Sequence, residues 1–372
     1  MKVPFIDISR FEAGFISAWV NKVAAMSTGA QFVGGAEVAA LEARLSDLLE
    51  VKHSIGCANG TDALQLALRA VGVGAGDVVA IPNATFWATF EAVVNVGASA
   101  VTVDCLLSDG GMDIGALEEA IRRERPKAAI LVHLYGWGSA SLTRMRDLCR
   151  KEGVLLIEDG AQCFGATFRG DPVLKGALIS TTSFYPAKVL GAAGDAGAVF
   201  TDNDELADQV RRLGNHGRTA HYGHGDVGWN SRLDSLQAAY LNLSLDVLDQ
   251  RIKSRREVAD VYRTRLPDVG LAAMEAPEGY AENGYCNVCL VADGDFKARL
   301  QTLMKQRGIG FGNIYPGTMA SQPGAAGFHK GHFGGNAGEQ LSQQVLNLPL
   351  FPYMTHPEID YVIETVRDAR IG

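Results

Sequence analysis

Short apolar runs alternate with helical patterns from about residue 36 to residue 245, and this alternation limits the possible folds more than any other feature of the chain. Continuous apolar strands separated by amphipathic helices predict a mostly parallel sheet that is covered on both faces. In such sheets ligands bind in the loops at the carboxyl ends of the strands. The expected strands are Val78–Ile81, Ala100–Val103, Ala128–Leu134, Val154–Ile157 and Ala196–Thr201, and the helices between them include Asp62–Val71, Ile114–Arg123 and Ser141–Glu152.

The character of the sequence changes after a long helical pattern at Ser235–Arg256. Beyond it we expect a strand near Tyr285–Ala292, a helix near Phe296–Arg307, a glycine-rich loop at 323–338 and a last helix near His356–Ala369. A chain of 372 residues is also too long for one ordinary core. The prediction is an α/β protein with a large domain at 1–249, including an N-terminal helical segment, and a small α+β domain at 250–372.

Composition excludes several functional classes. The net charge of −8 and the lack of a dense basic cluster argue against nucleic-acid binding. No run approaches the ~20 apolar residues that span a bilayer, and the first residues do not resemble a signal peptide. The six cysteines are scattered, apart from Cys286 and Cys289, which predicts free thiols in the cytoplasm. No second Cys-X-X-Cys pair accompanies them, so we expect no metal site.

Lys188 is the first candidate for chemistry. It ends the segment Ser183-Phe184-Tyr185-Pro186-Ala187-Lys188 and is followed by Gly191, Gly194 and Gly197. A lysine in a partly desolvated site has a lowered pKa and suits Schiff-base chemistry, and glycines let a planar cofactor approach the backbone. The alternative is an ordinary surface lysine beside a loop.

Asp159 is the second candidate, because it ends an apolar strand in Ile157-Glu158-Asp159-Gly160-Ala161-Gln162. A carboxylate at that edge can keep the ring nitrogen of pyridoxal phosphate protonated. The alternative is a helix N-cap, a position that aspartate favours.

A third candidate is the turn from strand to helix in Cys57-Ala58-Asn59-Gly60-Thr61-Asp62-Ala63-Leu64. Backbone N–H groups at a helix N-terminus, together with the Thr61 hydroxyl, can bind a phosphate. The alternative is a plain capped helix.

Together, the order and spacing of these three segments resemble the DegT/DnrJ-type sugar aminotransferases of the fold-type-I pyridoxal-phosphate class. The resemblance extends over essentially the whole chain. It also includes the segments Pro4-Phe5-Ile6-Asp7, Phe32-Val33-Gly34-Gly35-Ala36-Glu37-Val38, Thr85-Phe86-Trp87-Ala88-Thr89, Asn230-Ser231-Arg232-Leu233-Asp234-Ser235-Leu236-Gln237-Ala238-Ala239 and Leu348-Pro349-Leu350-Phe351-Pro352.

The resemblance implies roles for individual residues. Lys188 matches the lysine that bonds the cofactor and later moves a proton, and Asp159 matches the partner of the ring nitrogen. Gln162 matches a residue near the phenolic oxygen of the cofactor, and Phe86 matches the aromatic residue that stacks on its ring.

The resemblance also implies a phosphate site and a homodimer. Gly60, Thr61 and Ser183 match phosphate-binding positions. Asn230 matches an asparagine that reaches the phosphate from the neighbouring subunit, so the two active sites of a homodimer are shared. Arg232 is a candidate for holding a substrate carboxylate or phosphate, because a guanidinium can bind either one bidentately. A structural salt bridge is the alternative for Arg232, and His221 and Tyr315 are further substrate candidates.

The Asn230-Ser231-Arg232-Leu233-Asp234 loop is similar to that of relatives acting on 3-keto sugars. The resemblance therefore implies amino transfer from L-glutamate to the 3-keto position of a UDP-N-acetylglucosamine-type sugar, as in lipopolysaccharide precursors. Alternatives are a dTDP-3-keto-6-deoxyhexose or 4-keto-sugar aminotransferase and, from a different class, a non-catalytic pyridoxal-phosphate-binding regulator. Ile314 stands where many relatives have a histidine before the Tyr-Pro pair, which leaves the exact sugar open.

Gly223-His224-Gly225-Asp226-Val227-Gly228 spells the dinucleotide-binding fingerprint. It lacks both the preceding strand and the following helix that give this motif its function. A nicotinamide dehydrogenase is therefore not expected.

Overall fold

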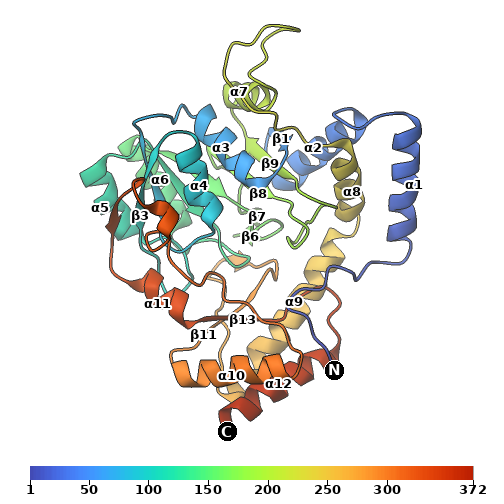
Figure 1. The fold of residues 1–372 in the computed structure, drawn as a ribbon, viewed down its shortest axis with the longest axis vertical. Coiled ribbons are helices and arrows are strands. Elements are labelled where there is room, and N and C mark those ends of the chain that lie inside the picture. The colour runs from blue at the N-terminus through green and yellow to red at the C-terminus, as the bar shows by residue number, and fades with distance from the viewer. Residues whose placement is uncertain (372) are drawn as a thin grey trace.

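The computed structural model describes residues 1–371, and its centre is an eight-stranded sheet with the order β1-β9-β8-β5-β4-β2-β3-β12 (Figure 1). Five of the seven neighbouring pairs are parallel, whereas β9 runs antiparallel to both β1 and β8. The predicted α/β fold with a mostly parallel sheet is confirmed. The strands are β1 (His53–Cys57), β2 (Val78–Pro82), β3 (Ser99–Val103), β4 (Ala128–Val132), β5 (Leu155–Asp159), β8 (Ile179–Ser183), β9 (Gly197–Thr201) and β12 (His329–Phe333).

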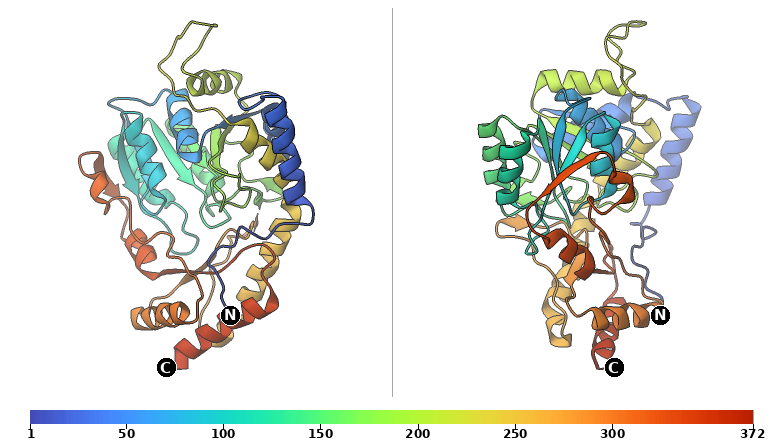
Figure 2. Two further views of the ribbon diagram at one scale, coloured as in Figure 1. Left: turned by 45° about the vertical axis from the view of Figure 1, so that its right-hand side comes forward. Right: turned by 60° about the vertical axis from the view of Figure 1, so that its left-hand side comes forward.

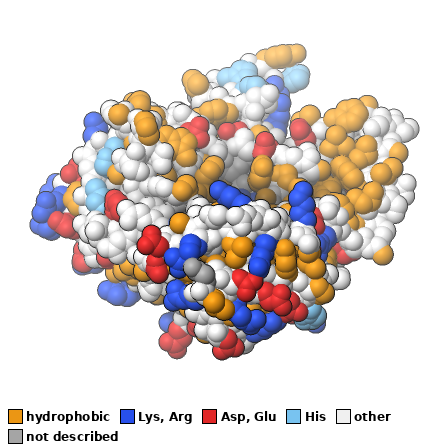
Figure 3. Space-filling model, turned by 60° about the horizontal axis from the view of Figure 1, so that its bottom comes forward, with side chains coloured by type: hydrophobic (Ala, Val, Ile, Leu, Met, Phe, Trp, Pro, Cys, Tyr) orange, Lys and Arg blue, Asp and Glu red, His pale blue; other side chains and the backbone are white. Residues whose placement is uncertain are grey.

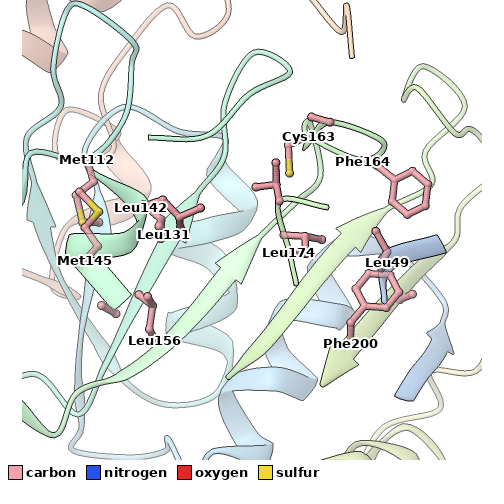
Figure 4. Packing of buried hydrophobic residues seen from close by; sticks show 14 of the residues in the cluster. Leu49, Met112, Leu131, Leu142, Met145, Leu156, Cys163, Phe164, Leu174 and Phe200 are labelled. Carbon is pink, nitrogen blue, oxygen red and sulfur yellow. The ribbon is translucent and has the colours of Figure 1, made fainter. Parts of the chain in front are cut away.

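Helices cover both faces of this sheet because neighbouring residues on a strand point to opposite sides. Leu156 packs in the core beneath one face, with α2, α5 and α6, whereas Ile157 packs beneath the other face, with α3, α4 and α7. Figure 4 shows part of the first core. These helices are α2 (Ala36–Leu49), α3 (Gly60–Ala70), α4 (Trp87–Asn95), α5 (Ile114–Glu124), α6 (Leu142–Glu152) and α7 (Asp204–Gly214).

A smaller unit with its own core lies below the large sheet in Figure 1 and contains both termini. Its two-stranded sheet pairs β11 with β13 in antiparallel fashion. Helix α9 runs from the large unit into the small one, and α1 lies along the outside of α8 (Figure 2). The remaining elements are α1 (Phe15–Thr28), α8 (Ser235–Leu245), α9 (Leu248–Arg265), η1 (Pro267–Val269), β11 (Asn287–Leu290), α10 (Gly294–Gln306), η2 (Pro323–Ala325), α11 (Ala337–Gln344), β13 (Val345–Leu348), α12 (His356–Ile371) and a three-stranded sheet of β6 (Thr167–Phe168), β7 (Asp171–Pro172) and β10 (Tyr280–Ala281).

Two predictions for the second half of the chain were wrong. The single helix expected at Ser235–Arg256 is two helices, because the chain turns at Asp246 and Val247 between α8 and α9. The loop expected at 323–338 contains β12, which pairs in parallel with β3 at the edge of the large sheet. An edge strand needs few apolar residues, and here Phe333 alone is buried. The domain boundary near residue 249 stays a prediction, and β12 lies on the far side of it.

Helices long and apolar enough to cross a membrane do not occur in residues 1–371. The six cysteines are free and buried. The same described residues contain no group of three or more His, Cys, Asp or Glu side chains that could hold a metal ion.

Candidate active site

A cleft of about 810 Å³ lies at the carboxyl ends of the parallel strands, where the topology of the sheet places ligand sites. Its size is typical of a small-molecule site. Asp159 ends β5 and Ser183 ends β8, while Gly60 begins α3. The lining also includes Thr61, Phe86, Gln162, Lys188, Tyr285 and Tyr315. The fold therefore collects residues from distant parts of the sequence into one site.

Lys188 reaches the cleft from the loop between β8 and β9. Its Nζ lies 3.3 Å from the hydroxyl oxygen of Tyr285. Burial lowers the pKa of the Lys188 ammonium, although the carboxylate of Asp159 acts in the opposite direction. Lys188 therefore lines the cleft and contacts Tyr285, unlike an ordinary surface lysine beside a loop.

Asp159 is buried, and its carboxylate accepts a hydrogen bond from the Ala161 amide at 2.9 Å. No α-helix begins here, since a turn follows β5, so the N-cap alternative is wrong. Burial raises the pKa of the Asp159 carboxyl, against the effects of that amide, Lys188 and His133. A cationic group brought beside Asp159 would lower this pKa again and be stabilised in return.

The N-terminus of α3 forms one end of the cleft. The Asn59 side chain accepts a hydrogen bond from the Asp62 amide at 2.8 Å, while the Gly60 and Thr61 N–H groups lie in the first turn of α3, where N–H groups have no partner within the helix. A β-carbon added at Gly60 would lie 2.6 Å from Cβ of Ser183. Gly60 therefore lets the helix N-terminus and Ser183 approach closely enough to form one cradle for an anion.

Gln162 fixes the opposite wall of the cleft. Its Oε1 accepts a hydrogen bond from the Tyr135 amide at 2.7 Å, and its Nε2 donates one to the Tyr315 hydroxyl at 2.8 Å. The ring of Phe86 lies 5.6 Å from that of Tyr315 at an angle of 38°. Phe86 is 56% exposed although it borders the cleft, so its ring offers a free apolar surface to a planar ligand.

Three predicted site residues lie outside this cleft. Asn230 is exposed and forms an isolated bridge with Asn215. Arg232 donates a hydrogen bond to Oδ1 of Asn215 at 2.6 Å, so its partner within its own chain is a neutral amide and not the carboxylate of a salt bridge. His221 is exposed in the loop between α7 and α8, which projects from the top of the molecule in Figure 1. Their roles towards a partner chain stay predictions.

The sequence did not reveal a buried ionic network under the site. Glu158, next to Asp159 on β5, points to the opposite side of the sheet and accepts hydrogen bonds from Arg146 at 2.7 and 2.8 Å. Its other contact is His133 Nε2 at 3.0 Å. Complete burial raises the pKa of the Glu158 carboxyl, but the hydrogen bonds from His133 and Arg146 outweigh it and hold this pKa below its ordinary value. The network anchors the strand end that carries Asp159.

The residues of the cleft fit pyridoxal phosphate. Gly60, Thr61 and Ser183 would form the anion cradle, and Phe86 would offer a face for the ring. Asp159 would supply the carboxylate for the ring nitrogen, and Lys188 would supply the amine.

Comparisons with known proteins agree with this arrangement. The model of the DegT/DnrJ/EryC1/StrS aminotransferase family matches residues 16–367. The chain is similar to the UDP-2-acetamido-2-deoxy-3-oxo-D-glucuronate aminotransferase of Pseudomonas aeruginosa, with 37% identity over 97% of this chain and 98% of that protein. It is also similar to the UDP-N-acetyl-3-dehydro-alpha-D-glucosamine 3-aminotransferase of Acidithiobacillus ferrooxidans, with 37% identity over 100% of this chain and 98% of that protein.

The chain is also similar to solved structures of aminotransferases. A DegT DnrJ EryC1 StrS aminotransferase from Brucella abortus superimposes with a TM-score of 0.92 and 33% identity, covering 98% of this chain and 99% of that one. NtdA from Bacillus subtilis, solved with its bound cofactor PMP, gives a TM-score of 0.90 and 29% identity, covering 100% of this chain and 86% of that one.

Proposed function

Since this chain belongs to the DegT/DnrJ/EryC1/StrS aminotransferase family, we propose that it transfers an amino group from L-glutamate to the 3-keto position of a UDP-linked 2-acetamido sugar. It is a sugar aminotransferase whose cofactor is pyridoxal 5'-phosphate. The observation that carries the proposal is the presence of Lys188 and Asp159 in one cleft at the carboxyl edge of the sheet. When bound, pyridoxal phosphate supplies a ring that stabilises negative charge on the carbon that loses or gains a proton.

The buried amine of Lys188 is the group that moves this proton. Its lowered pKa increases the neutral fraction of Nζ, so the amine can accept a proton from a substrate carbon and later return it. The cleft walls hold Nζ close to the reacting carbon, which removes much of the entropic cost of the step.

The remaining cleft residues bind and orient. Gly60, Thr61 and Ser183 would hold the phosphate, and Asp159 would hold the protonated ring nitrogen. Phe86 would stack on the ring, and Gln162 would lie near its phenolic oxygen. Tyr315, which receives a hydrogen bond from Gln162, is placed to contact the substrate.

The charge of the cleft supports a site shared between two copies of the chain. Its described lining contains four carboxylates, at Asp62, Glu91, Asp159 and Asp195, but a single cation at Lys188. A cofactor phosphate and a nucleotide diphosphate need more positive charge or more hydrogen-bond donors than this. We propose that Asn230 and Arg232 of a second copy supply them, and that His221 approaches the sugar from the same partner loop.

An apolar surface on α1 supports the same assembly. Ile16 and Val20 are 47% and 57% exposed on this helix, and Val33 is 59% exposed nearby in the sequence. Figure 3 shows apolar side chains gathered on the side of the molecule where α1 lies. Exposed apolar patches of this kind mark interaction surfaces, and we propose a homodimer that covers this one.

Two observations support the choice of a 3-keto UDP-sugar. The loop from Asn230 to Asp234 resembles that of relatives that act on 3-keto sugars, and the two relatives at 37% identity are named for UDP-linked 3-oxo and 3-dehydro sugars. Ile314 lines the cleft where many relatives have histidine, so we propose that the sugar contact there is apolar.

An isotope experiment tests the proposal. The purified enzyme with pyridoxal phosphate is given ¹⁵N-labelled L-glutamate and either a 3-keto or a 4-keto UDP-2-acetamido sugar, and the product is analysed by NMR. We expect the label on carbon 3 of the first sugar and none on the second. Preferential labelling of the 4-keto sugar, or of a dTDP-linked 3-keto sugar offered in parallel, would contradict the assignment of a 3-keto UDP-sugar as the substrate.

A further inference from the structure

The hydroxyl of Tyr285 is the side-chain hydrogen-bond partner of the Lys188 amine in the part of the chain that the structure describes. We propose that Tyr285 is a positioning residue that holds the free amine of Lys188 between proton transfers and controls whether that amine is charged. This inference rests on the proposed function, because it concerns the same proton transfer. Neither the sequence motifs nor the names of the relatives assign this tyrosine a role.

Two contacts join these residues. Nζ of Lys188 lies 3.3 Å from the Tyr285 hydroxyl oxygen and 5.1 Å from the centroid of the tyrosine ring. An ammonium donates a hydrogen bond to the phenol oxygen and is also attracted to the ring face. A neutral amine can instead accept a hydrogen bond from the phenol O–H. The contact therefore holds Nζ in both of its protonation states.

The backbone of Tyr285 is fixed in place by a buried asparagine. The Tyr285 amide donates to Oδ1 of Asn283 at 2.9 Å, and Nδ2 of Asn283 donates to the backbone oxygens of Gln162 at 2.8 Å and Phe164 at 2.9 Å. Asn283 is fully buried. The segment that carries Tyr285 is thus tied to the same loop that places Gln162 in the cleft.

This anchoring fixes the backbone of Tyr285, and its ring packs against both cores of the large unit, whereas the lysine stem is flexible. A lysine side chain has many rotamers, and this conformational freedom must be lost each time Nζ is aligned with a reacting atom. A rigid hydrogen-bond partner removes part of that cost before the reaction begins.

Each titratable group near Nζ affects its charge in a known direction. Burial lowers the pKa of Lys188, while Asp159 and the Cys286 thiol raise it. Burial also holds the pKa of Tyr285 well above its ordinary value, so the phenol keeps its proton. Arg255 lies near Cys286 and Tyr285, and Tyr315 near Cys286 and Asp159. Because the phenol oxygen and the ring face favour the ammonium, removing them should lower the pKa of Lys188 further.

The test uses Tyr285→Phe, which keeps the ring and removes the hydroxyl. In the cofactor-free protein, the rate at which trinitrobenzenesulfonate modifies Lys188 is measured against pH, with the peptide identified by mass spectrometry. The reagent attacks the neutral amine, so the midpoint of the curve reports the pKa. We expect the midpoint to fall by about one pH unit, the scale of a lost hydrogen bond to a charged group. Tyr285→Leu, which also loses the ring, should lower it further.

In the complete enzyme, Tyr285→Phe should reduce kcat by about tenfold, which corresponds to about 1.4 kcal/mol. The KM for both substrates should stay within about twofold, because the lost contact acts on proton transfer and not on substrate binding. The control is Tyr262→Phe, which removes the hydroxyl of a fully buried tyrosine in the small unit, where it lies 3.9 Å from the Met354 sulfur. The control should change neither kcat nor the midpoint.

An unchanged midpoint in Tyr285→Phe, or a kcat that stays within twofold of the wild type, would overturn the proposal. The titration requires neither the sugar nor the cofactor. Failure of the wild type to aminate any keto-sugar would therefore refute the proposed function separately.

Discussion

Asp159 and Lys188 line the same cleft, and burial shifts their pKa values in opposite directions, upward for the carboxyl and downward for the ammonium. Burial disfavours the charged form of each group. A protonated ring nitrogen beside Asp159 would restore the negative charge of the carboxylate, while Lys188 could stay a neutral amine. The cleft is thus suited to a cationic ring on one side and a proton-accepting amine on the other.

Asp159→Asn tests the first half of this arrangement. The neutral amide cannot hold a ring nitrogen protonated, so we expect kcat to fall by about 10²-fold or more, the scale of one lost charge-stabilising group. The control is Asp113→Asn, which changes a carboxylate that caps α5 away from the cleft. Activity of Asp159→Asn within a few-fold of the control would mean that Asp159 has only a structural role.

Gly60→Ala tests the phosphate cradle. The added methyl group would lie 2.6 Å from Cβ of Ser183, so the helix N-terminus must move away, and we expect at least a ~10-fold weaker affinity for pyridoxal phosphate, a loss of about 1.4 kcal/mol. Gly294→Ala is a matched control, because Gly294 also begins a helix but has open space around it. Equal affinities of the two variants, measured by absorbance titration, would place the phosphate elsewhere.

Glu158→Gln tests the buried network. Removing the charge leaves Arg146 and His133 without their buried carboxylate, so we expect the free energy of unfolding to fall by about 3 kcal/mol near pH 7. The control Glu119→Gln breaks an exposed pair with Arg123 and should cost less than about 0.5 kcal/mol.

The pH dependence of this effect has a defined sign. The folded pKa of Glu158 is lowered, so its stabilisation is complete above the unfolded value of about 4.3 and is lost as the pH falls through the lower folded pKa. Urea titrations should therefore show a constant difference between wild type and Glu158→Gln above about pH 5.5 and a shrinking one below about pH 4. A difference in stability that grows as the pH falls would contradict a lowered folded pKa of Glu158.

The sequence predicted much of the sheet but not all of it. Strands β2 to β5 each contain a mostly apolar run, and the structure confirms a strand at each of them. By contrast, β8 reads Ile-Ser-Thr-Thr-Ser and β12 reads His-Lys-Gly-His-Phe, so neither has an apolar run to reveal it. These strands are set by pairing with neighbours far away in the sequence, which a local pattern does not contain.

The residues of the site also divide into those that a local pattern reveals and those that only tertiary packing brings into place. Lys188, Asp159 and Gly60 lie in local segments whose chemistry can be read directly, and the fold brings them together. Tyr285 is 97 positions from Lys188, and its hydrogen bond arises from tertiary packing. The strand predicted near Tyr285–Ala292 did not indicate that its first residue would contact the Lys188 amine.

Mixed dimers test the shared site. If Asn230 acts on the partner's cleft, Asn230→Ala and Lys188→Ala homodimers should both be inactive, because every site carries a lesion. In a heterodimer with one change per chain, both lesions fall on one site and leave the other intact. We expect such heterodimers, isolated with two affinity tags, to show about half the wild-type activity. No recovery would place Asn230 in the site of its own chain.

The most direct test of the account is the first half of the reaction in the absence of any sugar. Enzyme saturated with pyridoxal phosphate is mixed with excess L-glutamate, and 2-oxoglutarate is quantified after rapid quenching. Amino transfer through Lys188 predicts about one equivalent of 2-oxoglutarate per chain for the wild type and, over the same time, at least about 10³-fold slower formation by Lys188→Ala. No 2-oxoglutarate from the wild type, or equal rates from the two proteins, would contradict the assignment of this cleft as an aminotransferase site.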